Sequence, residues 1–377
     1  MATDATPTGG RHRSRTRRGP APAATRPGST GPRLEGLDVA RGLAVLSMLV
    51  AHLSPVGGVL DVSEYLTAPL FAVTIGVALG VRLSRADVDR RRIVADDVLR
   101  GVLLVLVGVL LQALYGQIDV VLPYLGVLVV VLAPLALLLR RLPVLTLGLV
   151  TAGAVLGPLV TERLRDRVAA DPSVAAGVTG DLLRWVATGP NYRLVSFLPM
   201  ALAGVVLVLL LPRLTRLALT SGIAAVLLGT SAVIHLIGRT TEDGAAPYSG
   251  TTAEVLAATF LACGAVVASF AVVLLVRGPA PGLARALTPV LAVGRLAFTA
   301  YTVQILVLAA ISLARGGADD DTWPVLVGTT AVVVGVCWVL DRRVGTGPLE
   351  ALVRATRMPS RGRHGGPLSG LRPPRAR

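Results

Sequence analysis

Long runs of apolar residues dominate this chain of 377 residues. Ten segments stand out: 37–57, 66–83, 98–115, 119–139, 142–161, 193–211, 214–237, 253–276, 288–313 and 323–340. Runs of about 18 or more apolar residues have the length that an α-helix needs to cross a bilayer. Many of them are rich in Leu, Val and Ala with internal Gly, which suits helix packing in lipid. The pattern predicts an all-α fold, a polytopic transmembrane bundle of about ten helices.

The two ends of the chain have a different composition. Residues 1–34 and 356–377 are rich in Arg, Pro and Gly and hold few aliphatic side chains. Such segments bury too little apolar surface to offset the entropy lost on ordering. We expect two disordered basic tails around one multipass membrane domain at 35–355.

Composition agrees with this class, and charge adds an orientation. The chain is 53% hydrophobic, its mean hydropathy is +0.70 and its net charge is +15. With ten helices, the main Arg clusters fall on one face of the membrane together with both termini, and the positive-inside rule makes that face cytoplasmic. Basic tails beside anionic lipid need no nucleic-acid partner, so none is predicted. Small residues on lipid-facing surfaces permit a homodimer.

The first apolar segment carries the most informative polar residues, which are Asp38, Arg41 and His52. Ionisable groups inside membrane segments are rare and commonly functional. Arg41 and His52 are eleven residues apart, which returns a helix to within about 20° of the same face. A neutral imidazole is a common general base, so His52 is the catalytic candidate. Two structural alternatives stay open: Asp38 and Arg41 can pair with each other, and His52 can bond a neighbouring helix.

Two groups of motifs carry a family resemblance. The stretch from Arg33 to Met48, with Arg41 and His52 spaced as Arg-x10-His, resembles the start of the transmembrane acyltransferase superfamily, which includes heparan-alpha-glucosaminide N-acetyltransferase. The segments 293–304 and 347–354 resemble the C-terminal region of YeiB-like bacterial membrane proteins, which carry a domain of unknown function. The resemblance spans most of residues 33–357.

The resemblance implies transfer of an acyl group from a cytoplasmic acyl-CoA, typically acetyl-CoA, to an extracytoplasmic sugar or small molecule. It implies a multi-pass protein of the bacterial cell (inner) membrane. In this reading His52 meets the acceptor near the outer face. Asp38, Arg41 and Arg295 lie near the cytoplasmic face, where they either position the donor or stabilise the fold.

Further polar residues are weaker candidates. Three of them are expected on the acceptor side. His235 lies near the outer end of the 214–237 segment, and Tyr192 and Tyr248 are interfacial. In the 288–313 segment, Arg295 and Thr299 recur at helical spacing, and Tyr301 and Gln304 lie deeper. Thr299, Tyr301 and Gln304 line a polar helix face or serve as interhelical hydrogen-bond partners.

Other functional classes have less support in the sequence. Cys263 and Cys337 both fall within apolar segments without clustered spacing, so neither a disulfide nor a metal site is predicted. A proton-coupled transporter or permease is the main alternative, because the same Asp, Arg and His can form a proton pathway. A non-catalytic membrane protein of the same fold is the third reading.

Overall fold

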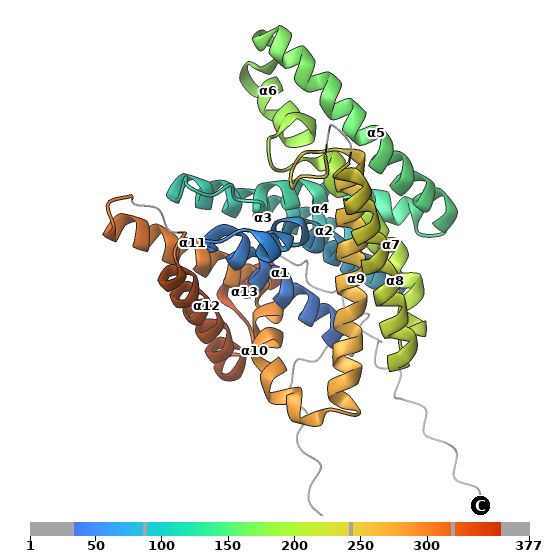
Figure 1. Cartoon of the computed structure of the whole chain (residues 1–377), viewed down its shortest axis with the longest axis vertical. Coiled ribbons are helices and arrows are strands. Elements are labelled where there is room, and N and C mark those ends of the chain that lie inside the picture. The colour runs from blue at the N-terminus through green and yellow to red at the C-terminus, as the bar shows by residue number, and fades with distance from the viewer. Residues whose placement is uncertain (1–33, 86–88, 241–243, 318–320, 356–377) are drawn as a thin grey trace, which may run out of the picture. The chain divides into compact units, whose positions relative to one another are not determined.

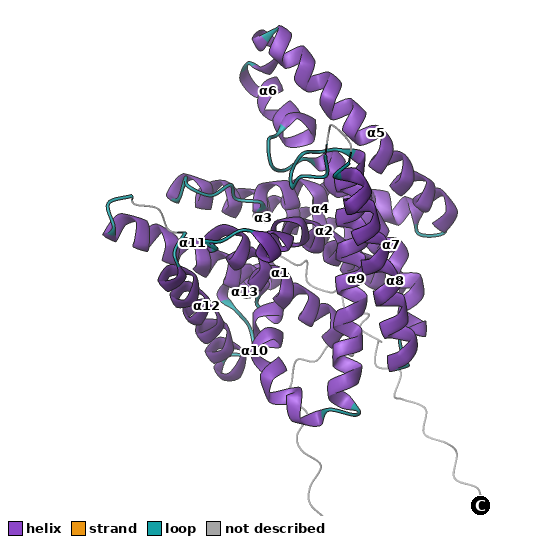
Figure 2. Ribbon diagram, viewed as in Figure 1, coloured by secondary structure: helices purple, strands orange, loops and turns teal. Residues whose placement is uncertain are grey.

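The computed structural model describes residues 34–85, 89–240, 244–317 and 321–355. Within these ranges the chain is helical and contains no strand (Figure 2). This confirms the prediction of a polytopic helical bundle. The two predicted tails lie outside the described residues, except for Leu34.

Thirteen α-helices make up the described part of the chain. They are α1 Glu35–Leu53, α2 Val62–Ser84, α3 Arg90–Leu114, α4 Leu122–Leu139, α5 Pro143–Ala170, α6 Gly177–Leu183, α7 Leu194–Leu207, α8 Leu217–Gly238, α9 Thr252–Arg277, α10 Ala284–Arg295, α11 Ala297–Ala314, α12 Trp323–Arg343 and α13 Pro348–Ala355.

Nine spans in the described ranges are long and apolar enough to cross a membrane, so the protein is a multi-pass membrane protein. They are α1, α2, α4, α5, α7 with its short 3-10 extension to Arg213, α8, α9, α11 and α12. The remaining predicted segment, 98–115, lies in α3, which packs along α4 (Figure 1). The helices α8 and α9 also run side by side.

Ion pairs gather at one end of the helices, which we call the basic end. Arg82 of α2 pairs with Asp97 of α3 at 2.7 Å, and Arg277 of α9 pairs with Glu35 of α1 at 2.8 Å. Arg295, at the end of α10, joins the same end through Asp38 of α1. The positive-inside rule predicts that the basic end faces the cytoplasm.

Glycines let α1 and α10 approach backbone to backbone. A Cβ added at Gly294 would lie 1.7 Å from the carbonyl oxygen of Asp38, and one at Gly42 would lie 2.3 Å from that of Val290. Small residues at helix crossings allow this approach in membranes, where dispersion contacts stabilise helix pairs. The close crossing places Arg295 beside Asp38.

Replacing Gly294 with alanine is expected to push α10 away from α1 and to lower stability by about 1–3 kcal/mol, as overpacking does. Thermal unfolding of the purified protein in detergent measures the loss. Gly229→Ala in α8 is the matched control, because nothing lies within 4 Å of its added Cβ. Equal melting temperatures for the two variants would contradict the close approach.

The prediction of one continuous helix at 288–313 is wrong in one respect. The chain leaves helical geometry at Leu296, whose φ is −113° and ψ is 32°, so α10 ends and α11 begins there. Arg295 therefore does not share one continuous helical stripe with Thr299. The local sequence marks the break only weakly, because Leu296 is a good helix former and Gly294, two residues earlier, is a common residue near helix ends.

A distant carboxylate stabilises the start of α11. Glu350 of α13 accepts hydrogen bonds from the backbone N–H groups of Phe298 and Thr299, both at 3.0 Å, and from the Thr299 hydroxyl. The first N–H groups of a helix have no partner within it, and a negative charge there is favourable. The two C-terminal motifs, 293–304 and 347–354, thus meet in space.

Glu350→Ala is expected to destabilise the protein by about 1–2 kcal/mol, the usual effect of losing an N-terminal cap. Thermal unfolding tests this expectation, and Glu350→Gln, which keeps one acceptor oxygen, should lose less. Arg354→Ala, an exposed change in the same helix, is the control. A melting temperature unchanged by Glu350→Ala would show that the cap contributes nothing.

Candidate functional site

A cavity of about 540 Å³ lies at the end of the helices opposite the basic end. We call it the polar cavity. It is built from the C-terminal end of α1, the start of α2, the loop between α3 and α4, and the segments before α7, α9 and α12. The lining residues are Ala51, His52, Glu64, Gln117, Ile118, Asp119, Asn191, Tyr192, Tyr248 and Asp321.

The polar cavity brings together residues that are far apart in the sequence. His52, the catalytic candidate, shares it with two of the three acceptor-side candidates, Tyr192 and Tyr248. The ends of antiparallel helices meet at one level of a bundle, and this is why loops so distant in sequence meet here. Sequence reasoning named these three residues separately and gave no reason to place them in one cavity.

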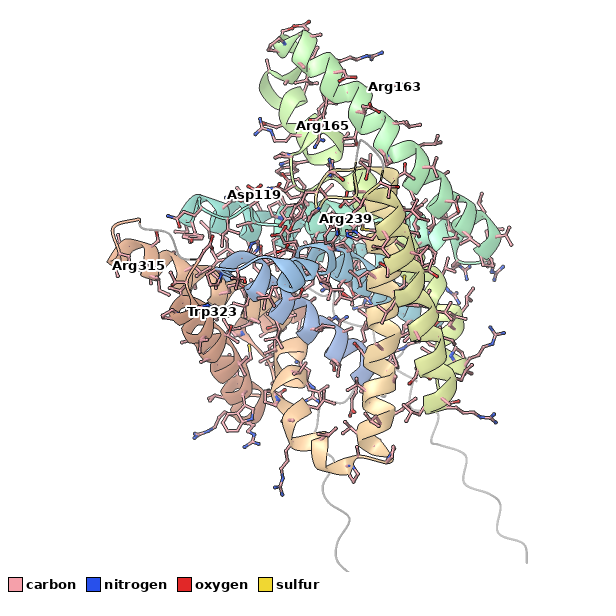
Figure 3. All side chains as sticks on the ribbon, viewed as in Figure 1. Asp119, Arg163, Arg165, Arg239, Arg315 and Trp323 are labelled. Carbon is pink, nitrogen blue, oxygen red and sulfur yellow. The ribbon has the colours of Figure 1, made fainter. Side chains whose placement is uncertain are left out.

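Three carboxylates join them: Glu64, Asp119 and Asp321. Asp119 accepts a hydrogen bond from the side-chain amide of Asn191, and Figure 3 shows Asp119 near the start of α4. Sequence reasoning missed Glu64 as a site residue. Its signal in the sequence was weak, because Glu64 lies two residues before the predicted apolar segment 66–83, and only the observed start of α2 at Val62 places it inside the helix.

Tyrosine rings form one wall of the polar cavity. The rings of Tyr192 and Tyr248 meet edge to face with centroids 5.7 Å apart, and Tyr192 also contacts Tyr124 at 5.5 Å. Burial raises the pKa of Tyr192 well above its ordinary value. Burial, together with the negative charge of Glu64, raises the pKa of Tyr248 to about 12. Both phenols therefore stay protonated and can donate hydrogen bonds at neutral pH.

The raised pKa predicts how Tyr248 titrates. A free tyrosine ionises near about pH 10, so between about pH 10 and pH 12 the unfolded chain loses a proton that the folded protein keeps. Stability from this group is therefore present below pH 10 and is lost as pH rises toward 12. Tyrosinate ultraviolet absorbance should show a late step, which Tyr248→Phe lowers by the absorbance of one tyrosine and which the other buried tyrosines retain. Ionisation of every tyrosine near pH 10 in the folded protein would contradict this prediction.

Tyr248 is held in an unusual backbone conformation. Its φ is 63°, and no other non-glycine residue in the described ranges has a positive φ. The Nη2 of Arg193, a side chain only 1% exposed, donates to the Tyr248 carbonyl at 2.8 Å. A second hydrogen bond holds the backbone two residues farther on, where the N–H of Gly250 donates to the side chain of Glu254 at 2.8 Å. Strained residues of this kind often lie at functional sites.

Arg193 lies at the centre of this arrangement. Burial lowers the pKa of its guanidinium, while the charge of Glu254 opposes that change. Glu254 is itself 8% exposed and lies in the first turn of α9. From sequence, Arg193 resembled an ordinary interfacial residue at the start of a helix, because its burial depends on the distant 244–250 segment.

The three donor-side candidates come together at the basic end. Arg41 pairs with Asp38 at 3.4 Å, and Arg295 pairs with Asp341 at 2.9 Å and lies 3.8 Å from Asp38. Two guanidinium groups thus face two carboxylates, and the cluster is close to neutral. A phosphate-rich donor needs cations that are not already neutralised, so this geometry favours the structural role over phosphate binding.

The helix face between Arg41 and His52 is packed. Val45 and Met48 lie on the same stripe of α1 and are 0% and 1% exposed. Neither Arg41 nor Asp38 lines the polar cavity. In this conformation, apolar side chains separate the charged cluster from the cavity along α1.

The remaining candidates occupy other places. His235 lines a second cavity, where its ring meets Tyr65 edge to face at 5.0 Å. The Tyr301 hydroxyl accepts the Val121 N–H at 3.1 Å, and Thr299 binds Glu350, so both link neighbouring helices. Gln304 is 0% exposed, and its side-chain amide has no hydrogen-bond partner among the described residues. None of the three lines the polar cavity.

The described residues hold no group of three or more His, Cys, Asp or Glu side chains suited to a metal ion. Cys263 and Cys337 are both buried free thiols. Helix packing accounts for their position without any further role.

Comparison with known proteins identifies part of the chain. No curated protein matches it significantly. Residues 206–358, which contain α8 to α13, match the family described as protein of unknown function (DUF418). His235, Tyr248, Arg295 and Glu350 fall inside the matched region, whereas His52 and Tyr192 lie outside it. The protein is therefore a multi-pass membrane protein whose C-terminal part contains a DUF418 domain.

Proposed function

We propose that this protein is a membrane acyltransferase of the bacterial cell membrane. It moves an acetyl or similar acyl group from a cytoplasmic acyl-CoA to a sugar or small molecule bound in the polar cavity. The observation that carries the proposal is the position of His52 in the cavity wall, beside two protonated tyrosines and three carboxylates. The resemblance of the Arg41–His52 motif to the transmembrane acyltransferases supports the same chemistry.

The cavity suits an acceptor with hydroxyl or amine groups. Glu64, Asp119 and Asp321 accept hydrogen bonds from such groups, while Tyr192 and Tyr248 donate to ring or carbonyl oxygens. These contacts hold the acceptor beside His52. A neutral imidazole takes the acceptor proton as the acceptor oxygen or nitrogen attacks the acyl carbon. The thioester C–S bond then breaks, and the CoA sulfur leaves as a thiolate that takes up a proton and is released as the free thiol. The alternative, in which His52 first carries the acyl group itself, uses the same neutral imidazole.

The donor supplies an activated acyl group. The proposal does not use Arg41 or Arg295 to bind it. Both guanidinium groups already face carboxylates. The packed Val45 and Met48 also separate the cluster from the cavity. The proposal therefore includes a movement of helices around α1 that lets the acyl group reach His52.

The proposal is tested with purified protein in liposomes supplied with radiolabelled acetyl-CoA and a panel of sugars. We expect label to move from acetyl-CoA to a sugar or, transiently, to the protein. Absence of both transfers would overturn the proposal. Donor-independent uptake of a sugar into the same liposomes would instead identify a transporter, in which a cavity closed on one side is one of two alternating states.

A further inference from the structure

A second cavity, of about 790 Å³, lies beside the polar cavity. Its walls come from α2, α8 and α9, and the segment 244–247 covers one end. Most of its surface is apolar and comes from Val62, Leu228, Ala232, Ala257, Ala258 and Leu261. We call it the tail groove. Its volume falls within the range of about 300–1,000 Å³ that small-molecule sites occupy.

The tail groove lies between two membrane-spanning helices. Both α2 and α8 pack against α9 but hardly touch each other, so α9 forms the floor of the gap between them. On α8, Val226 and Val233 are 68% and 55% exposed. Exposed aliphatic side chains on a spanning helix face lipid. The groove therefore lies beside a lipid-facing surface, near the membrane face that holds the polar cavity.

The two cavities share a wall. Glu64 lines both of them. On the 244–250 segment, Pro247 lines the tail groove and the next residue, Tyr248, lines the polar cavity. Tyr65, adjacent to Glu64, fixes this segment by donating its hydroxyl to the Ala245 carbonyl. A molecule with an apolar part and a polar part can thus occupy both cavities by passing beside Glu64.

The charge of the polar cavity restricts the polar part. Its lining, as far as the described residues go, contains three carboxylates and no Arg side chain. An anionic head such as a phosphate is repelled there, whereas hydroxyl groups find acceptors on Glu64, Asp119 and Asp321. Among the described residues, Arg239 is the Arg that lines the tail groove, and His235 and Asp61 also line it.

We propose that the acceptor is a glycolipid-like amphiphile whose hydrocarbon tail lies in the tail groove and whose uncharged sugar head lies in the polar cavity. This inference rests on the proposed acyl transfer, because it names the class of acceptor. The lipid enters sideways from the outer leaflet between α2 and α8. Its head then meets His52 without leaving the membrane surface.

Photocrosslinking tests the inference without any activity measurement. The full-length protein is placed in phosphatidylcholine vesicles that contain a monoglucosyl diacylglycerol with a diazirine in one acyl chain. Illumination followed by mass spectrometry should place the crosslinks on Leu228, Ala258 and Leu261. A phosphatidylglycerol with the same diazirine chain should crosslink there at least about tenfold less.

Two matched variants check the location. Ala232 is exposed and lines the groove, so Ala232→Trp should fill the groove and lower the crosslinking of Leu261 about tenfold. Val233→Trp, on the neighbouring lipid-facing position, should leave it unchanged. Equal crosslinking by the two lipids, or glycolipid crosslinks only on exposed faces of the unaltered protein, would overturn the inference. Transfer of acetyl to soluble sugars with no groove crosslinking would leave the enzyme assignment intact and reject only the lipid acceptor.

Discussion

Substitution of His52 by alanine is expected to abolish acyl transfer by the purified protein, with a fall in rate of about 10²–10⁴-fold. The imidazole is the one side chain of the polar cavity that is commonly a neutral base at physiological pH, and the carboxylates there are weaker bases. Transfer of radiolabel from acetyl-CoA to the acceptor measures the loss. Insertion and folding should stay normal, because His52 lies at the edge of a cavity and is only partly buried.

The matched controls for His52 are the two histidines of the tails. His12→Ala and His364→Ala should keep full activity, since both lie outside the predicted membrane domain. His52→Gln keeps hydrogen-bonding groups and removes the base, so it should be as inactive as the alanine variant. If all three alanine variants transferred acyl groups at the same rate, the assignment of His52 as the base would be wrong.

Arg193→Ala is expected to lower the free energy of unfolding by about 1.5–3 kcal/mol, as the loss of a buried hydrogen bond from a charged group does. The side chain is 1% exposed, and it holds the Tyr248 carbonyl while its charge acts on the buried Glu254. Removing it leaves a carboxylate without its nearby cation and frees a residue with φ of 63°. Thermal unfolding in detergent measures the effect.

A double variant separates the charge effect from the loss of packing. Arg193→Met with Glu254→Gln should recover part of the lost stability, because neither replacement is charged. Arg163→Ala, an exposed change on α5 seen in Figure 3, should stay within about 0.5 kcal/mol of the unaltered protein. A double variant no more stable than Arg193→Ala would assign the loss to the Tyr248 contact alone.

The membrane-spanning nature of the protein could be predicted from sequence, because the hydrocarbon core of a bilayer places the same requirement on each spanning segment. Every backbone group in a spanning segment must bond within that segment, so each span has a minimum length and an apolar composition. The same rule holds for each segment separately and needs no knowledge of the others. It failed at 98–115, which lies in α3 but is not one of the nine candidate spans of the described residues. It failed again at Leu296, where Glu350, 54 positions farther along the chain, supplies the acceptor that lets α11 begin anew.

The partners of the polar residues could not be predicted in the same way. A pair between Asp38 and Arg41, three positions away, was one of the alternatives that the sequence left open, and the two side chains do pair at 3.4 Å. Asp341 belongs to the last spanning helix, and no sequence spacing connects it with Arg295, which it binds at 2.9 Å. The ion pairs turn a predicted cationic donor site into a nearly neutral cluster.

By itself, the sequence determined that the chain crosses the membrane many times and that His52 is an unusual intramembrane residue. Both follow from the cost of polar groups in hydrocarbon, which acts residue by residue. Only the tertiary structure decided that His52 shares a cavity with Tyr192, Tyr248 and Glu64, and that Arg193 is buried beneath them. These contacts join helices separated by scores of residues, and helix packing in lipid depends on close surface fit, which no local pattern encodes.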